Sequence, residues 1–210
     1  IVQPGEKENE FRRQVGIGGK FVVMYAGNLG VNSSLEDVIG AARLLREEAD
    51  IRFLLVGEGV KKEELLNSAR TAGLDNVIFL PFQPRDDFNH MMAAADVGLV
   101  TLSADAHHTS MPSKTYNIMA SGRPILAVTP LHSDVAALVD SCECGMVVAP
   151  GNPAQLAARI LELKNQPEAA CRMGLNGRRR LEERYTRQHC IDLYDRDFKS
   201  VTQTQPSTRE

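Results

Sequence analysis

The segment from Thr109 to Pro124 holds the residues best suited to bind an anion. Pro112 and Ser113 stand where a helix should begin, so several backbone N–H groups of its first turn have no partner within the helix. Those N–H groups and the helix dipole attract phosphate and other anions. Lys114 falls in the same turn, where a cation is disfavoured by about 0.3–1 kcal/mol unless an anion binds beside it. The pattern predicts an anion site at this helix start, and a surface lysine in solvent is the alternative interpretation.

Two further places offer surfaces that suit parts of a nucleotide. Asn117 lies one turn after Lys114, and its amide could bind sugar hydroxyls if it faces a cleft. If it faces away, it is a solvated helix residue. Phe82 and Gln83 follow a short apolar run and place a flat ring beside an amide, which suits a nucleobase. The alternative for Phe82 is a ring folded beneath its own loop.

The glycines that follow the first two apolar runs match no standard nucleotide motif. Gly27-Asn28-Leu29-Gly30 is not Gly-x-Gly-x-x-Gly, and no acidic residue ends the second run as a dinucleotide ribose ligand would. No Gly-Lys-Ser/Thr follows a glycine loop, so the Walker A motif is absent from the sequence. The glycines at 57 and 59 predict by themselves only a turn.

The cysteines and histidines form no pattern typical of a metal site. Zinc sites use about four ligands, whereas Cys142 and Cys144 have no second pair and the other two cysteines fall in predicted helices. His107 and His108 stand in a polar loop, where we interpret them as exposed residues, with a ligand contact as the alternative. We therefore expect neither a metal nor a cofactor.

Six apolar runs alternate with helical patterns, and these elements have to position the candidate residues. Continuous apolar runs are typical of strands buried on both faces of a parallel sheet. N-caps are predicted at Ser34, Asp86 and Asn152, and the chain beyond Asn152 is helical in about three segments. The predicted class is α/β, a doubly wound parallel six-stranded sheet of Rossmann-like form with C-terminal helices. The predicted strands span 21–26, 51–56, 77–80, 97–102, 125–128 and 146–148.

Ligands of such sheets bind beyond the carboxyl ends of the strands. That rule selects the loops 27–33, 57–59, 81–85 and 103–114, in or beside which all the candidate residues lie.

The composition is that of an ordinary globular protein. The chain has 210 residues, of which 43% are hydrophobic and 24% charged, so a disordered or collagen-like chain is excluded. No run approaches the roughly 20 apolar residues of a membrane helix. A net charge of −3 gives no general attraction for nucleic acid. Four cysteines are too few for a disulfide scaffold, so we expect a protein of the reducing cytoplasm.

Several linked motifs resemble the donor-binding half of GT-B glycosyltransferases. They are similar to the retaining group that contains bacterial capsule and exopolysaccharide transferases, glycosyltransferase family 4, over residues 20 to 185. The run Gly145–Pro153 resembles that family's Gly-Leu-Leu-Val-Pro-Pro-Gly-Asp-Pro. The other motifs, in order, are Tyr-Ala-Gly-Asn-Leu at 25–29, Leu-Leu-Val-Gly-Glu-Gly at 54–59, Val-Ile-Phe-Leu-Pro-Phe at 77–82, Ala-Ala-Asp-Val-Gly-Leu at 94–99 and Met-Ala-Ser-Gly-Arg-Pro-Ile at 119–125.

The resemblance implies two Rossmann-like domains, of which this chain is the second. Residues 1–19 would be the interdomain connection and a lead-in helix, and 20–185 the nucleotide-sugar-binding domain. Residues 186–201 would form a helix that packs back toward the missing N-terminal domain, followed by a flexible tail at 202–210. The missing domain would bind the acceptor, a sugar or lipid-linked sugar, and could bring the protein peripherally to the inner membrane. Alone, such a fragment is expected to be inactive.

The resemblance also places neutral residues where the family carries charge. Asn28 stands at the arginine that pairs with the donor diphosphate, and Ser33 at the lysine a few residues later. Thr109 and Asn117 stand at two glutamates, the first of which normally touches the donor sugar and the second the ribose. Lys114, in a Pro-Ser-Lys variant of this loop, could restore part of the phosphate charge.

The implied function is donor binding in a retaining glycosyltransferase of cell-surface polysaccharide synthesis, with a UDP- or GDP-linked sugar. Negative charge grows on the departing diphosphate and has to be stabilised. The catalytic candidates are Lys114 for that charge and Thr109 for the sugar. Asn117 would hold the ribose, Phe82 with Gln83 the base, and Ser110 the sugar. The full set expected to contact the substrate is Gly27, Asn28, Ser33, Gly57, Glu58, Phe82, Gln83, Ser110, Met111, Pro112, Ser113, Lys114 and Asn117.

Two alternatives stay open. A noncatalytic nucleotide-binding or scaffold domain of the same fold is favoured by the neutral residues at these positions. A non-hydrolysing sugar-nucleotide epimerase also resembles this fold, but it needs catalytic carboxylates, which Thr109 and Asn117 do not supply.

Overall fold

A parallel sheet forms the centre of the protein. The computed structural model describes residues 2–105 and 111–203. Its strands run in the order β3-β2-β1-β4-β5-β6, and every neighbouring pair is parallel. The predicted doubly wound, six-stranded α/β fold is therefore confirmed, with strand ends shifted by one residue in β4 and β6. The strands are β1 (Phe21–Ala26), β2 (Ile51–Val56), β3 (Val77–Leu80), β4 (Val97–Thr101), β5 (Ile125–Val128) and β6 (Gly145–Val148).

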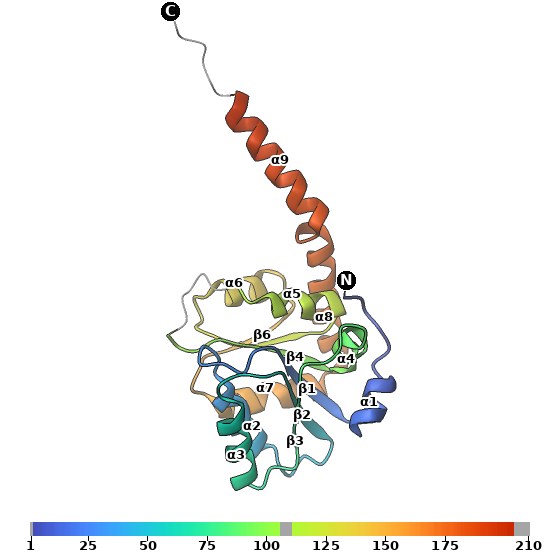
Figure 1. The fold of residues 1–210 in the computed structure, drawn as a ribbon, viewed down its shortest axis with the longest axis vertical. Coiled ribbons are helices and arrows are strands. Elements are labelled where there is room, and N and C mark those ends of the chain that lie inside the picture. Colours follow the sequence, from blue (N-terminus) through green and yellow to red (C-terminus); the bar gives the residue numbers. More distant parts are fainter. Residues whose placement is uncertain (1, 106–110, 204–210) are drawn as a thin grey trace, which may run out of the picture.

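Helices cover both faces of this sheet (Figure 1). Successive side chains of a strand point to opposite faces, so Val23 and Tyr25 of β1 enter one core while Val22 and Met24 enter the other. The first core packs against α2, α3 and α7, and the second against α1, α4, α5 and α6. The helices are α1 (Glu10–Val15), α2 (Leu35–Leu44), α3 (Lys62–Thr71), α4 (Phe88–Ala94), α5 (Ser113–Ser121), α6 (Asp134–Ser141), α7 (Pro153–Asn165), α8 (Pro167–Arg184) and α9 (Arg187–Gln203).

Only one of the three predicted capping bonds forms. The Asn152 side chain accepts a hydrogen bond from the Gln155 N–H at the start of α7. Ser34 stands at the N-cap of α2, as predicted, but its side chain makes no capping bond. Its hydroxyl donates to the Leu102 carbonyl instead. The N-cap of α4 is Asp87 and not Asp86, and its side chain makes no capping bond. In both cases the tertiary position of the loop decides which partner the side chain can reach.

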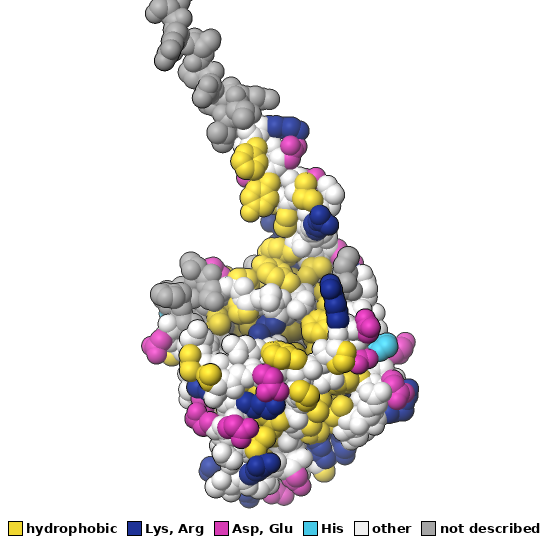
Figure 2. All heavy atoms as spheres, in the orientation of Figure 1, with side chains coloured by type: hydrophobic (Ala, Val, Ile, Leu, Met, Phe, Trp, Pro, Cys, Tyr) yellow, Lys and Arg dark blue, Asp and Glu magenta, His cyan; other side chains and the backbone are white. Residues whose placement is uncertain are grey.

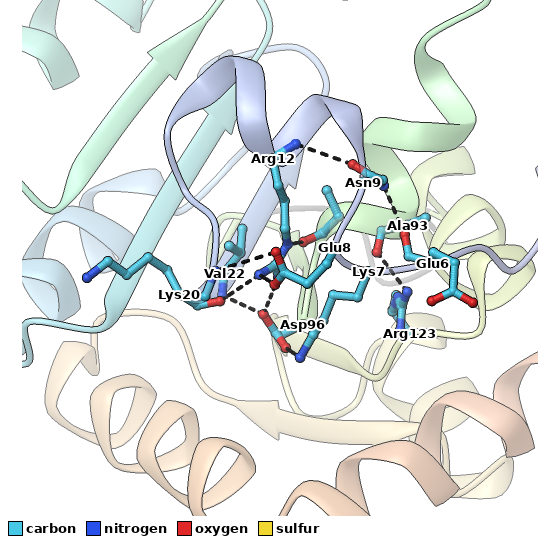
Figure 3. Close-up of polar contacts among 12 residues, drawn as sticks. Glu6, Lys7, Glu8, Asn9, Arg12, Lys20, Val22, Ala93, Asp96 and Arg123 are labelled. Atoms are coloured by element: carbon cyan, nitrogen blue, oxygen red, sulfur yellow. Dashed lines mark hydrogen bonds and ion pairs between the residues drawn. The ribbon is translucent and has the colours of Figure 1, made fainter.

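The lead-in segment is fastened to the amino edge of the sheet by a buried guanidinium (Figure 3). Arg12 of α1 is 0% exposed. It donates to the Asp96 carboxylate at 2.6 Å, to the carbonyls of Ala94 and Lys20, and to the Glu8 carboxylate. Asp96 also accepts from the Lys7 ammonium and from the backbone N–H of β1. Through this paired charge and the buried side chains of Phe11 and Ile17, the segment of residues 6–20 is packed against the domain, although most of its residues are exposed.

The helix α9, which follows α8, extends away from the body (Figure 1). The helix α9 follows a break after Tyr185 and presents the apolar side chains of Ile191, Tyr194 and Phe198 on its surface (Figure 2). That it packs against another domain stays a prediction. The tail predicted at 202–210 lies outside the described residues from 204 onward. No helix of the described part is both long and apolar enough to span a membrane.

Candidate functional site

A hollow of about 360 Å³ opens at the carboxyl edge of the sheet, where β1 and β4 are neighbours. Strand order reverses between these two strands, and α/β sheets bind ligands at such a point. One wall is the loop after β1, and another is the start of α5. The lining residues are Tyr25, Asn28, Gly30, Val31, Asn32, Ser33, Gly59, Val60, Thr101, Leu102, Pro112 and Lys114.

Among the described residues of this lining, Lys114 alone brings a charged side chain. Its ammonium lies 3.6 Å from the centre of the Tyr25 ring. Burial lowers the pKa of the amine to about 7, and no carboxylate among the described residues pairs with it. The prediction that Lys114 lies in the first turn of a helix is confirmed, and the alternative of a lysine in bulk solvent is wrong. The site therefore has a cation whose natural partner, an anion, is not supplied by the described chain.

The start of α5 adds unpaired donors beside this ammonium. The N-cap residue is Pro112, whose carbonyl accepts from the Thr115 N–H, and no side chain caps the helix within the described residues. Ser113 is exposed and Met111 packs partly against the apolar core. The N–H groups of Ser113 and Lys114, the first two residues of the helix, have no acceptor inside it. Together with the helix dipole they favour an anion at this position.

The glycines of the predicted loops allow two backbones to touch. A Cβ atom on Gly57 would lie 1.9 Å from the Gly27 carbonyl oxygen, and one on Gly59 would lie 2.3 Å from that of Leu29. The Leu29 N–H donates to the Glu58 carbonyl at 2.8 Å. The turn predicted at 57–59 is thus one half of a double loop that closes one side of the hollow. The Glu58 side chain itself pairs with Lys62, one turn on.

Asn28 and Ser33 both line the hollow, but differently. The Asn28 side chain is exposed and lies close to Gly30 and Gly59. Ser33 is buried, and its hydroxyl donates to the Gly30 carbonyl at 2.6 Å. The hydroxyl of Ser33 is therefore used to shape the loop, whereas the amide of Asn28 faces the ligand side.

Asn117 does not share this hollow with Tyr25. It is half-buried and lines an adjoining depression with Arg85 and Phe88, next to the stem of Lys114. Phe82 is 58% exposed, so the interpretation of a ring folded beneath its loop is wrong. The Gln83 amide nitrogen donates to the Pro81 carbonyl within the same loop. The predicted base contacts thus lie in the loop after β3, whereas the predicted ribose contact, Asn117, lies on α5 one turn after Lys114.

Thr109 and Ser110, the predicted sugar contacts, lie outside the described residues, as do His107 and His108. Two residues that the sequence did not single out belong to the site. Tyr25 falls within the apolar run 21–26, which predicts only a buried strand, although an aromatic residue two positions before the loop glycine is a usable signal. Arg85, in the loop 81–85 that the sequence already selected, lines the same depression as Asn117.

No group of three His, Cys, Asp or Glu side chains in residues 2–105 and 111–203 could hold a metal. All four cysteines are free thiols, and burial raises the pKa of Cys144 to about 12, which leaves it an inert core residue.

Most of the chain matches a known protein family. The family model for glycosyl transferases group 1 matches residues 7–180. This chain therefore belongs to the glycosyl transferases group 1 family, and its fold is that of the GT-B glycosyltransferases.

Two curated relatives are named as glycosyltransferases. The probable glycosyltransferase WbjE of Pseudomonas aeruginosa is 30% identical over 145 residues, which cover 69% of this chain and 36% of that protein. WcaI of Escherichia coli (strain K12), named as a colanic acid biosynthesis glycosyl transferase, is 34% identical over 122 residues, 58% of this chain and 30% of WcaI. The chain thus spans about a third of the length of these two relatives.

Solved structures show the same fold at low identity. HepE of Anabaena, solved with UDP, has a TM-score of 0.78 and 20% identity over 92% of this chain and 52% of HepE. A sucrose-phosphate synthase of Thermosynechococcus elongatus has a TM-score of 0.80 and 19% identity, over 97% of this chain and 50% of that one.

Proposed function

We propose that this chain binds the nucleotide-sugar donor of a retaining glycosyltransferase that builds cell-surface polysaccharide. The observation that carries the proposal is the Lys114 ammonium, which lies half-buried beside an uncapped helix start and pairs with no described carboxylate. A diphosphate would supply the missing anion. UDP and UDP-glucose are bound by HepE, a protein of this fold, and WcaI is named for a polysaccharide pathway.

The chemistry follows from where charge develops. As the bond between the sugar and the donor phosphate breaks, negative charge grows on the departing nucleoside diphosphate. The Lys114 ammonium and the N–H groups of Ser113 and Lys114 face that charge and lower the barrier by stabilising it. In this proposal the positive charge comes from the chain itself, with no metal or cofactor. The base would lie on Phe82 and the ribose at Asn117, while Thr109 and Ser110 would contact the sugar.

The acceptor belongs to a further part of the proposed enzyme. We infer that an acceptor sugar or lipid-linked sugar binds on a partner domain and that this chain alone does not turn over. A second candidate function is a noncatalytic nucleotide-binding domain, which the neutral Asn28 and Ser33 favour, because both line the hollow where the resemblance places cations.

Calorimetry on the purified chain separates these possibilities. We expect UDP or GDP to bind, and uridine or guanosine to bind at least about tenfold more weakly, a difference of about 1.4 kcal/mol. Lys114→Met should greatly reduce that difference, because it removes the ammonium and leaves the base contact and the backbone N–H groups of the helix start. Lys20→Met, which changes a lysine at the opposite edge of the sheet, should leave it intact. Absence of binding by UDP, GDP and ADP would overturn the proposal.

A further inference from the structure

The Lys114 side chain passes over the end of the sheet from one face to the other. Its helix, α5, packs on the face that contains Met24, whereas the ring under its ammonium belongs to Tyr25, which enters the opposite core. The stem of Lys114 lies beside Met24, Ala26 and Leu99 on the way. Gly27 makes the passage possible, because a Cβ atom there would lie 3.0 Å from the Lys114 Nζ and 3.1 Å from its Cε.

Tyr25 contacts both walls of the hollow. It is 1% exposed, and its ring supports the ammonium of α5 at 3.6 Å. Its hydroxyl donates to the Asn28 carbonyl at 2.7 Å and so holds the loop after β1. One side chain therefore connects the cation to the loop that forms the facing wall.

We propose that Tyr25 is a positioning residue for Lys114, whose ring face holds the ammonium at the hollow while its hydroxyl fixes the loop of residues 27–33 around the same anion. This role rests on the proposed function, in which that anion is the donor diphosphate. In this proposal Tyr25, a residue of β1, sets both the protonation state and the position of the Lys114 ammonium that binds phosphate.

The physical reason is the cost of burying an unpaired ammonium. Burial lowers the Lys114 pKa to about 7. Two hollows lie beside Lys114, and residues of β1, β4, α4 and α5 line them. Among the described lining residues, Tyr25 is the only other titratable group. His107 and His108 of the adjacent loop lie outside those residues. A ring face attracts a cation, more strongly when water is excluded. Burial also raises the pKa of the Tyr25 phenol, so the ring stays neutral at physiological pH.

Two substitutions separate the ring from the hydroxyl. Tyr25→Phe and Tyr25→Leu both lose the bond to Asn28, but only Tyr25→Leu loses the aromatic face. We expect the Lys114 Cε signal of ¹³C-lysine-labelled protein, followed by NMR without nucleotide, to titrate in Tyr25→Phe as in the parent. In Tyr25→Leu the midpoint should fall by about half a pH unit or more, because the charged form loses its support. Affinity for UDP at pH 8 should then be about fivefold lower than in Tyr25→Phe, with a smaller difference at pH 6.

The controls keep the two proposals apart. Phe53→Leu changes a buried aromatic residue of β2 and should leave the Lys114 midpoint unchanged. If Tyr25→Leu does not fold, Tyr25→Met, which is longer and fills more of the site, replaces it. Equal midpoints in the Phe and aliphatic variants, with UDP bound normally by the parent, would overturn the role of Tyr25. A parent chain that binds no nucleotide would overturn the proposed function, while the midpoints would still report the contact between ring and ammonium.

Discussion

Two cations stand at opposite edges of the same sheet, Arg12 fully buried and Lys114 half-buried, and they differ in what surrounds them. Arg12, at the amino edge, donates to two carboxylates and two carbonyls (Figure 3). Lys114, at the carboxyl edge, has a tyrosine ring as its described partner and a lowered pKa. A buried charge with a full set of acceptors holds elements together, whereas one without a counter-ion is costly to the fold and available to a ligand. The contrast separates a structural cation from a binding one.

The largest change in the free energy of unfolding is expected for a substitution at the amino edge. Asp96→Ala would leave the Arg12 guanidinium buried without its close carboxylate and should lower the free energy of unfolding by about 3–5 kcal/mol. Urea denaturation measures this. Glu8→Ala is the matched control, because Glu8 pairs with the same guanidinium but is 55% exposed, and it should cost less than about 1 kcal/mol. Equal losses in the two variants would show that burial of the pair does not matter.

At the carboxyl edge we expect a smaller change in the free energy of unfolding and one of opposite sign, because replacing Lys114 should stabilise the chain. The pKa of Lys114 is about 7 in the folded chain and near the ordinary lysine value of 10.5 when the chain is unfolded. Between these values the unfolded chain binds the extra proton, so stability should rise with pH from about 7 to 10.5. Lys114→Met should be more stable than the parent by about 1–3 kcal/mol at pH 6. Its stability should not show the increase between about pH 7 and 10.5 that the Lys114 amine causes in the parent. Urea denaturation at pH 6 and pH 9 tests this, and parallel pH dependences would contradict it.

The smallest effect, a loss of nucleotide affinity, is expected for the exposed ring of Phe82 beside the site. Phe82→Ala should weaken UDP and uridine equally, by about 1 kcal/mol, because a base loses its flat contact. The free energy of unfolding should change by less than about 0.5 kcal/mol, since the ring is exposed. Leu131→Ala, an exposed apolar change in another loop of the same edge, is the control and should leave both affinities unchanged. A loss confined to UDP would place Phe82 near the phosphates instead of the base.

Some of the site could be predicted from neighbouring residues alone. The start of α5 and the place of Lys114 in its first turn follow from a Pro-Ser pair ahead of a helical pattern, which is local information. The exposure of Phe82 and the separate depression that holds Asn117 could not be predicted, because each depends on which loops pack beside it. The wrong N-cap contact of Ser34 has the same origin, since its partner Leu102 lies 68 residues away.

What the sequence by itself determined is the order of strands and helices, and through it the edge of the sheet where a ligand can bind. Apolar runs and helical periods arise from contacts within a few residues, and parallel strands leave their carboxyl ends at one edge. Only the tertiary structure decided that Lys114 lies on Tyr25 and that Arg12 meets Asp96, 84 residues away. The partner of a buried charge is whatever the packed sheet brings within about 4 Å, and no local pattern encodes that distance.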